Sequence, residues 1–457
     1  MMSKVLLINP WIYDFSAYDF WNKPIGLLYL ASLLRMNGAD LFFIDCLDPY
    51  PVDFHNGQEN LKPKRKPTGE GTYLRHLIQK PDCLKDVRRH FYSYGMTPYH
   101  FLRSLKSIPV PDIVMMTSMM TYWYPAVFAT VRLVHQAFPG VPVVLGGNYV
   151  TLCPEHASKS GAEYVLPGPA ELTIPALMKN LFHQDMRFLP DHNNLDSHPY
   201  PAFDLIRHPD QVPIMASRGC PYRCSYCASH LINNQFRRRD PIRVADEIEH
   251  WHSRLGIRHF SFYDDALLID PPGMAIPLLK ELIRRNLPTR FHCPNGLHLR
   301  DITPELSNLM FKAGFKTIRF GFETSDDLRQ RSTGGKVDNR ELIEAVVCLK
   351  RAGYRGDEIG VYLLCGLPGQ SAEEVKESIL FVLSCGARPI IAEYSPVPGT
   401  GLWKEAMDAS PYPITEELLF QNNTLLPCRN DSLTYEMVQT LKLMCRKPDL
   451  DLQRDRL

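Results

Sequence analysis

Short apolar segments alternate with amphipathic segments along the first 170 residues, and this alternation constrains the fold more than any other feature. Five segments read as buried strands because they are apolar and end at turn residues; they cover 4–10, 40–48, 112–118, 141–147 and 162–168. Strands separated by helices favour right-handed crossovers within a parallel sheet. We therefore predict an α/β domain with a doubly wound parallel sheet, whose ligands bind beyond the carboxyl ends of the strands.

A second alternation begins at residue 213. It predicts six further strands, over 213–220, 259–265, 289–296, 316–324, 359–369 and 388–399. Between them, Thr303 and Pro304 begin a helix that ends at Gly314, and Ser371 with Glu374 is expected to form a capping box. Six β/α units in one domain predict a partial (β/α)6 barrel of the TIM type, with its chemistry at the carboxyl ends of the strands.

These two patterns divide the chain into domains. We expect the first domain over 1–185, with an insertion at 49–110 that is too long for a simple connection and forms a lid or a partly disordered arm. A Pro- and Asn-rich linker follows over 186–210, then the partial barrel over 211–405. The last segment, 406–457, has weaker periodicity, and we expect it to cover the mouth of the barrel.

Composition excludes several functional classes. The formal net charge of +1 gives no electrostatic footprint for nucleic acid or for an anionic membrane. The N-terminal segment does not resemble a signal peptide, and no apolar run approaches the roughly 18 residues of a spanning helix. Twelve cysteines in 457 residues are too few for a disulfide scaffold. The sequence therefore predicts a soluble cytoplasmic protein that binds neither nucleic acid nor membrane.

Three cysteines depart from this scattered usage. Cys220, Cys224 and Cys227 follow the spacing C-x-x-x-C-x-x-C, so that one loop can present three thiolates to one iron–sulfur cluster. A closed structural cluster would use four cysteines, and the next one in the sequence is Cys293. Three ligands leave one iron open for a small molecule, which favours a catalytic site. A zinc site with His230 as the fourth ligand is the alternative.

The cysteine loop resembles the C-x-x-x-C-x-aromatic-C signature of the radical S-adenosylmethionine superfamily. This resemblance implies a four-iron, four-sulfur cluster whose open iron binds S-adenosylmethionine, which is then cleaved to a 5′-deoxyadenosyl radical. It also implies the residues around that cofactor. Asp264 and Asp265 would accept from its amino group, Glu323 would reach its ribose or methionine end with Arg319 on the same strand face, Gly366 and Gly369 would line the nucleoside, and Tyr226 would lie against the adenine.

The first domain resembles the cobalamin-binding, Rossmann-like domain of many radical enzymes, through the fragments at 8–10, 24–38, 44–46, 145–149 and 167–171. This resemblance implies that the corrin and its tail are surrounded by Thr117, Ser118, Gly146, Gly147 and Gly168. The D-x-H-x-x-G cobalt-ligating motif is absent, because the run DFHNG at 53–57 has the wrong spacing. Many members of the family also lack that motif, so cobalamin remains the expected cofactor.

These resemblances lead to three functional hypotheses. The first is a cobalamin-dependent radical methyltransferase acting on an unactivated centre. The second is a radical cyclisation or rearrangement without methyl transfer, and the third is a non-catalytic iron–sulfur redox sensor. The enzyme readings imply a small-molecule or peptide substrate that the sequence does not identify, and an electron donor such as flavodoxin or ferredoxin.

Overall fold

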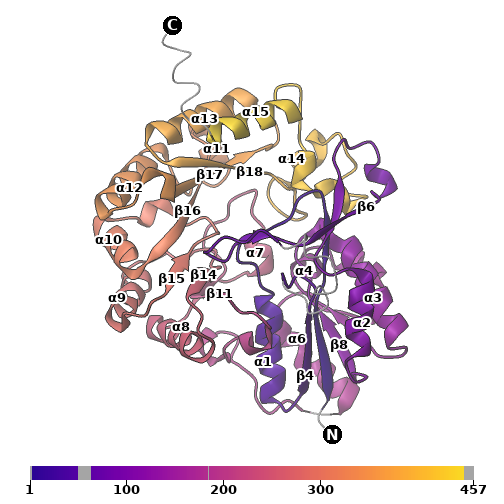
Figure 1. Cartoon of the computed structure of the whole chain (residues 1–457). Coiled ribbons are helices and arrows are strands. Elements are labelled where there is room, and N and C mark those ends of the chain that lie inside the picture. The colour runs from indigo at the N-terminus through magenta and orange to yellow at the C-terminus, as the bar shows by residue number, and fades with distance from the viewer. Residues whose placement is uncertain (1–2, 50–62, 184, 447–457) are drawn as a thin grey trace. The chain divides into compact units, whose positions relative to one another are not determined.

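The computed structural model describes residues 3–49, 63–183 and 185–446. Within them the chain divides into two compact units, residues 1–212 and 213–457. No helix in the described segments is long and apolar enough to cross a membrane. Figure 1 shows the path of the chain from the N-terminus to the C-terminus.

The first unit is built on a five-stranded sheet in the order β10-β9-β8-β1-β4. All four pairings in this sheet are parallel. The strands match the five predicted segments and are β1 (Lys4–Asn9), β4 (Asp40–Asp45), β8 (Ile113–Met116), β9 (Val143–Leu145) and β10 (Tyr164–Val165). The strand order reverses between β1 and β8, and ligands bind at such a switch point in doubly wound sheets.

Helices cover both faces of this sheet. One face carries alternate strand residues such as Val5 and Leu7, which pack with the apolar stripes of α1 and α6. The helices of the unit are α1 (Ile25–Met36), α2 (Pro98–Lys106), α3 (Tyr124–Ala137), α4 (Asn148–Leu152), α5 (Pro154–Ala157) and α6 (Ala170–Phe182). Each buried aliphatic side chain contributes roughly 1.5–3 kcal/mol relative to exposure.

The described part of the predicted insertion is folded. β7 lies at the centre of a three-stranded antiparallel sheet with β2 and β6, and β3 pairs with β5. These short strands were not predicted from the sequence; they are β2 (Ile12–Asp14), β3 (Tyr18–Asp19), β5 (Gly71–Thr72), β6 (Arg75–Ile78) and β7 (Phe91–Tyr94). The helix α2 also falls in the predicted insertion. It packs against α3, which follows the insertion, and so belongs to the α/β framework. Residues 50–62, which include the run DFHNG, lie outside the described residues.

The segment predicted as a linker packs on the first unit. The backbone of Ala202 donates to Leu28 O at 3.0 Å, and the hydroxyl of Ser32 donates to Tyr200 O at 2.6 Å. Asn37 exchanges two hydrogen bonds with the backbone of Phe188, both at 2.9 Å. These contacts fix residues 188–202 along α1.

The second unit is built on a six-stranded sheet in the order β11-β14-β15-β16-β17-β18. The pairings from β14 to β18 are parallel. The strands are β11 (Gln211–Ile214), β14 (His259–Phe262), β15 (Arg290–His292), β16 (Phe315–Glu323), β17 (Ile359–Cys365) and β18 (Arg388–Glu393). Strand order equals chain order, which confirms the predicted partial (β/α)6 barrel.

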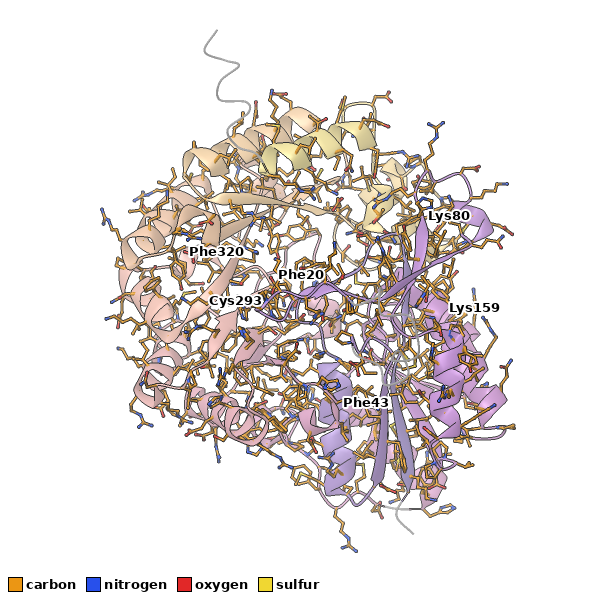
Figure 2. The ribbon with its side chains drawn as sticks, in the orientation of Figure 1. Phe20, Phe43, Lys80, Lys159, Cys293 and Phe320 are labelled. Carbon is orange, nitrogen blue, oxygen red and sulfur yellow. The ribbon has the colours of Figure 1, made fainter. Side chains whose placement is uncertain are left out.

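Helices line the outer face of the second sheet (Figure 1). Phe320 of β16, which is labelled in Figure 2, is fully buried. The helices that alternate with the strands are α8 (Pro241–Leu255), α9 (Ala275–Arg285), α10 (Pro304–Ala313), α12 (Asn339–Ala352) and α13 (Ala372–Ser384). Further elements lie between them or follow them: β12 (Ser217–Arg218), β13 (Arg237–Arg238), α7 (Ser229–Ile232), α11 (Asp327–Ser332), α14 (Trp403–Ala409) and α15 (Tyr435–Arg446).

Local sequence signals determine several helix ends. Thr303 caps α10 by accepting from Leu306 N at 3.1 Å, Pro304 occupies its first turn, and Gly314 ends it with φ of 92°, as predicted.

The C-terminal segment 406–457 was predicted to cover the mouth of the barrel. Its helix α15 does not do so, because it packs against α13 and β18. Residues 421–430 contact the carboxyl ends of β17 and β18: Ser395 Oγ donates to Gln421 O and Asn430 Nδ2 donates to Gln370 O.

Candidate active site

The three cysteines lie on one loop that directly follows β12. β12 pairs with β13 in antiparallel fashion, and Cys227 N donates to Cys224 O at 3.0 Å, which turns the loop back on itself. Gly219 precedes the first cysteine with φ of 80°, and a Cβ there would lie 2.5 Å from Gln235 O. Only glycine therefore admits this path of the backbone into the loop.

Two other segments hold the cysteine loop. Ser225 N donates to Thr333 O at 3.0 Å, and Leu402 N donates to Ser225 O at 2.8 Å. A Cβ at Gly334 would lie 3.0 Å from Cys224 Cα, so the backbone after α11 packs directly on the second cysteine. The loop is thus held on both sides by backbone contacts, which suits a site that must keep three thiols in fixed positions.

The three thiols influence one another electrostatically. Burial, with smaller contributions from the neighbouring Asp265, Cys224 and Cys227, raises the pKa of Cys220 to about 11. The pKa of Cys227 is raised for the same reason, chiefly burial. Thiols with raised pKa values lose their protons when iron binds, since the metal stabilises the thiolate. The donor set therefore fits a metal cluster.

A single metal ion makes a different geometric demand. No group of three or more His, Cys, Asp or Glu side chains within 3–49, 63–183 and 185–446 could hold one ion. The zinc site considered from the sequence, which would join the three cysteines and His230, is therefore not formed in this structure. In a cluster each thiolate binds a different iron atom, so the sulfur atoms need not converge on one point.

The two adjacent aspartates have different surroundings. Asp264 is buried and accepts from Ala216 N at 3.2 Å and from Ser217 Oγ at 2.6 Å, so it fixes the backbone before the cysteine loop. Burial raises the pKa of Asp264 to about 6. Asp265 accepts from Ser229 Oγ at 2.6 Å and acts electrostatically on Cys220 and Cys227. Of the two, Asp265 is the carboxylate beside the cysteines.

Glu323 ends β16 next to a residue that the sequence analysis missed. Its carboxylate forms an ion pair with Lys336, and the two side chains are 11% and 14% exposed. The Lys336 ammonium lies 5.7 Å from the centre of the Tyr226 ring. Burial alone would lower the pKa of Lys336, but Glu323 and Cys224 outweigh it and raise that pKa. The available signal was the Gly-Gly pair before Lys336, since adjacent glycines indicate close backbone approach.

Tyr226 and Arg319 also lie in the second unit. The ring of Tyr226 packs against an apolar cluster that includes Leu367 and Tyr394, and burial raises the pKa of Tyr226 well above its usual value. Arg319 pairs in register with Gly360 of β17 and acts on the hydroxyl of Tyr362, whose pKa is raised by burial and lowered in part by Arg319. The expected stacking of Tyr226 on adenine stays a prediction.

The loop that carries Gly366 and Gly369 is closed by Gln370. Its amide oxygen accepts from Gly366 N at 2.8 Å and from Leu367 N at 3.2 Å. Both glycines have positive φ, 95° and 67°, which favours glycine. A Cβ at Gly369 would meet nothing within 4 Å, so this side of the loop is open. The glycine loop is therefore a rigid turn with one accessible edge.

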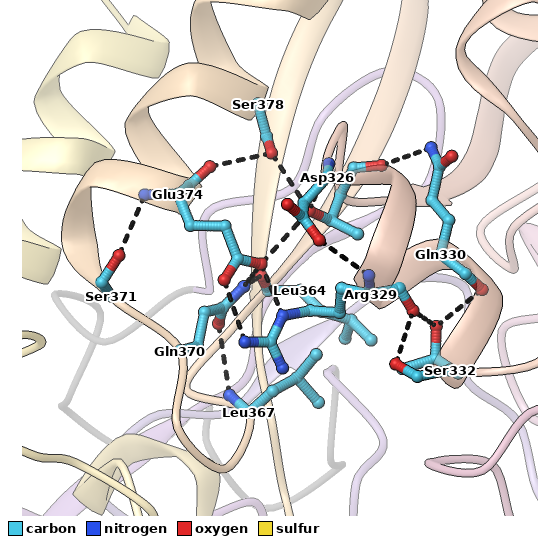
Figure 3. Close-up of polar contacts among 12 residues, drawn as sticks. Asp326, Arg329, Gln330, Ser332, Leu364, Leu367, Gln370, Ser371, Glu374 and Ser378 are labelled. Atoms are coloured by element: carbon cyan, nitrogen blue, oxygen red, sulfur yellow. Dashed lines mark hydrogen bonds and ion pairs between the residues drawn. The ribbon is translucent and has the colours of Figure 1, made fainter.

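Glu374 does not complete the predicted capping box. Ser371 caps α13 as expected, by accepting from Glu374 N at 3.2 Å. The Glu374 carboxylate instead binds Arg329 through two hydrogen bonds of 2.6 and 2.9 Å, and accepts from Gln370 Nε2 at 3.3 Å (Figure 3). The prediction of a reciprocal box was wrong because an arginine from α11 competes for the carboxylate. The resulting network links the end of β16 to the glycine loop.

His298 is a second residue that the sequence analysis missed. It is 5% exposed, and its Nδ1 has no hydrogen-bond partner among the described residues. Its ring lies 4.9 Å from that of Tyr222, within the cysteine loop. Burial, together with Lys336 and Arg300, lowers the pKa of His298 to about 3, so this imidazole is neutral. Cys293, by contrast, is buried beside Asp264, which contributes to its raised pKa after burial.

In the first unit, the predicted corrin residues lie where β8, β9 and β10 end. Ser118 Oγ donates to Gly146 O at 2.8 Å, which joins the loops after β8 and β9. A Cβ at Gly147 would lie 2.3 Å from Ser118 O and 3.0 Å from Thr117 Oγ1. Gly147 is thus required by the close packing of these two loops, and its φ of 98° agrees with this.

Gly168 lies on the loop after β10. Its N–H donates to Thr151 Oγ1 at 3.0 Å, and that hydroxyl donates to Gly147 O at 3.0 Å. A Cβ at Gly168 would meet nothing within 4 Å, and its φ is 82°. The three loops therefore form one connected edge with open space at Gly168, at the carboxyl ends where a doubly wound sheet binds ligands. These residues fit a large ligand at this edge.

The two units define a class of protein: an α/β enzyme that combines a doubly wound ligand-binding sheet with a partial barrel carrying a three-cysteine loop. Comparison with known families makes this assignment specific. The model of the Radical SAM superfamily matches residues 214–382, and that of the B12 binding domain matches residues 95–178. The chain is therefore a radical S-adenosylmethionine enzyme with a B12-binding domain, and its cofactors are a four-iron, four-sulfur cluster, S-adenosylmethionine and cobalamin.

Individual proteins resemble parts of the chain. An uncharacterized methyltransferase of Pyrococcus horikoshii is 26% identical over 331 residues, which cover 65% of this chain and 70% of that protein. An anaerobic magnesium-protoporphyrin IX monomethyl ester cyclase of Cereibacter sphaeroides is 28% identical over 43% of this chain and 32% of its own length.

A solved structure shares the fold over most of the chain. The radical S-adenosylmethionine methyltransferase TsrM of Kitasatospora setae, with cobalamin and a [4Fe-4S] cluster bound, superposes with a TM-score of 0.65. The match covers 90% of this chain and 80% of that one, at 16% sequence identity.

Proposed function

We propose that this protein is a cobalamin-dependent radical S-adenosylmethionine methyltransferase that methylates an unactivated centre. The observation that carries the proposal is a three-cysteine loop, held at fixed positions, in a chain that also has a B12-binding domain. The Pyrococcus horikoshii relative is named as a methyltransferase, which supports the same reaction class. When bound, the cluster and cobalamin supply the electron and the methyl-transfer chemistry, and the protein supplies binding, orientation and exclusion of water.

We assign the cluster ligands to Cys220, Cys224 and Cys227. Their shared loop and their mutual electrostatic influence support this assignment. Asp265 is our candidate for the amino group of S-adenosylmethionine, because it is the carboxylate beside the cysteines. A carboxylate is suited to an ammonium group in a site that excludes water. Asp264 instead supports the loop through Ala216 and Ser217.

The remaining cofactor contacts are assigned by position. Glu323 and Arg319 lie on β16, and Tyr226 lies in the cysteine loop. We assign Tyr226 to the adenine of S-adenosylmethionine, and Glu323, with Arg319 on the same strand face, to its ribose or methionine end. Gly366 and Gly369 provide a turn with an open edge for the nucleoside. In the first unit, Thr117, Ser118, Gly146, Gly147 and Gly168 are assigned to cobalamin.

A second candidate function is radical cyclisation. It is favoured by the relative from Cereibacter sphaeroides, which is named as a cyclase but is matched over only 32% of its length. The redox-sensor hypothesis has less support, since a sensor would not need Asp265 and Glu323 beside the cysteine loop. For either enzymatic function we propose an electron donor of the flavodoxin or ferredoxin type and a small-molecule or peptide substrate.

The test separates methyl transfer from the other uses of S-adenosylmethionine. Protein reconstituted anaerobically with iron, sulfide and hydroxocobalamin is incubated with S-adenosylmethionine and a reductant, and products are measured by mass spectrometry. Methyl transfer leaves S-adenosylhomocysteine, whereas radical generation leaves methionine and 5′-deoxyadenosine. Methylation of an unactivated centre uses S-adenosylmethionine in both ways, so we expect 5′-deoxyadenosine together with cobalamin-dependent S-adenosylhomocysteine. Only 5′-deoxyadenosine would favour cyclisation, and neither product would favour the sensor.

A further inference from the structure

Lys336 and Glu323 form a nearly buried ion pair next to the cysteine loop. The Lys336 ammonium binds Glu323 Oε1, and the side chains are 14% and 11% exposed. Its distance from the Tyr226 ring centre is 5.7 Å, which places it beside the residue between the second and third cysteines. Removing a charged group from water is costly unless a partner of opposite charge is held close to it. Each member of this pair therefore requires the other.

The end of β16 is shaped around this pair. Glu323 has φ of 74°, although it is not glycine, and the register with β17 shifts between Gly321 and Glu323. A Cβ at Gly321 would lie 2.7 Å from both Glu323 Oε1 and Lys336 Nζ. A non-glycine residue at positive φ is strained and persists only when its surroundings enforce that conformation. The strand end is thus strained in a way that directs the carboxylate toward Lys336.

The lysine is also tied to the cysteines through the backbone. Thr333 O accepts from Ser225 N at 3.0 Å, and Gly334 packs on Cys224 Cα with φ of 127°. The segment 333–336 therefore connects the cysteine loop to the end of β16 within three residues. Movement of either element would be transmitted to the ion pair.

We propose that Lys336 is a positioning residue whose ammonium fixes the Glu323 carboxylate, and balances its negative charge, beside the cluster and S-adenosylmethionine. The role rests on the proposed assignment of the three cysteines to the cluster. Since one oxygen of Glu323 is bound by Lys336, the other remains for the cofactor. A negative charge left without its partner near the cluster opposes reduction, because the added electron is repelled.

The experiment measures the midpoint potential of the reconstituted cluster by an anaerobic titration followed by electron paramagnetic resonance. We expect K336M to shift the potential to more negative values and E323Q to shift it to more positive values. The double variant returns toward the wild-type potential, and K336R, which keeps the charge, stays close to it. K316M removes an exposed lysine at the start of the same strand and serves as the control with no shift.

The same variants are titrated with S-adenosylmethionine in the oxidised state. We expect K336M to weaken binding about tenfold, the size of one hydrogen bond to a charged group, and K336R to restore most of it. Iron-loaded variants whose potentials do not move, or in which K336M and E323Q shift the same way, would overturn the role of Lys336. If K336M lost its cluster, an unshifted E323Q would still overturn it. Wild-type protein without iron would instead overturn the cluster assignment and this role with it.

Discussion

At the scale of single residues, two neighbouring aspartates have separate tasks. Asp265 stands beside the cysteines, whereas Asp264 accepts from the backbone and hydroxyl that precede the cysteine loop. We predict that Asp265→Asn weakens binding of S-adenosylmethionine about tenfold or more, because a neutral amide cannot balance an ammonium group. Isothermal titration of cluster-loaded protein measures this. Asp264→Asn is the matched control, and equal losses of affinity in both variants would contradict the assignment.

Asp264 also predicts a dependence of stability on pH. Burial raises its pKa from 3.8 to about 6, so the folded state holds the proton more tightly than the unfolded state. This contribution is present in full below about pH 4 and is lost as the pH rises through 6, with a total of about 3 kcal/mol. The melting temperature of the wild type should therefore fall relative to that of Asp264→Asn between pH 4.5 and 7.5. Parallel curves for the two proteins would refute this prediction.

At the scale of elements, a network around Glu374 joins α11, α13 and the glycine loop. Arg329 binds both oxygens of Glu374, and Gln370 connects that carboxylate to Gly366. We predict that Arg329→Met lowers the unfolding free energy by about 1–3 kcal/mol, because Glu374 keeps its charge without its partner. Hydrogen exchange should rise at residues 366–370. Arg331→Met, at an exposed position of the same helix, should change neither quantity.

Elements whose signals are local were predictable from the sequence. The spacing of Cys220, Cys224 and Cys227 defined the cysteine loop, and Thr303 with Gly314 defined both ends of α10. The eleven strands of the two main sheets followed from apolar segments bounded by turns. These features depend on residues within a few positions of one another, so their patterns are visible in a single sequence.

Features that depend on distant contacts were not predictable. Lys336 reaches Glu323 only because the backbone after α11 returns to the cysteine loop at Gly334. The prediction of a capping box at Ser371 was wrong because Arg329, 45 residues away from Glu374 in the sequence, binds the Glu374 carboxylate. The strands β2, β6 and β7 were missed because their sequences, IYD, RHLI and FYSY, mix polar with apolar residues and do not form the apolar runs that marked the predicted strands.

At the scale of the whole molecule, each unit contains one of the two proposed sets of cofactor residues. The cysteine loop belongs to residues 213–457, and the edge formed by the loops at Thr117, Gly147 and Gly168 belongs to residues 1–212. Each set is held by hydrogen bonds within its own unit. The two cofactors should therefore load separately, which a pair of reciprocal variants can test.

Cys224→Ser should abolish the iron–sulfur absorbance while hydroxocobalamin is still retained through gel filtration. Gly168→Val should do the reverse, because its side chain would occupy the open space beside the proposed corrin edge. Gly161→Ala is the control for backbone strain: Gly161 also has positive φ, 88°, but precedes β10 and so lies at the opposite end of the strand. Loss of both cofactors in either variant would show that loading is coupled, and retention of the corrin by Gly168→Val would remove Gly168 from the cobalamin site.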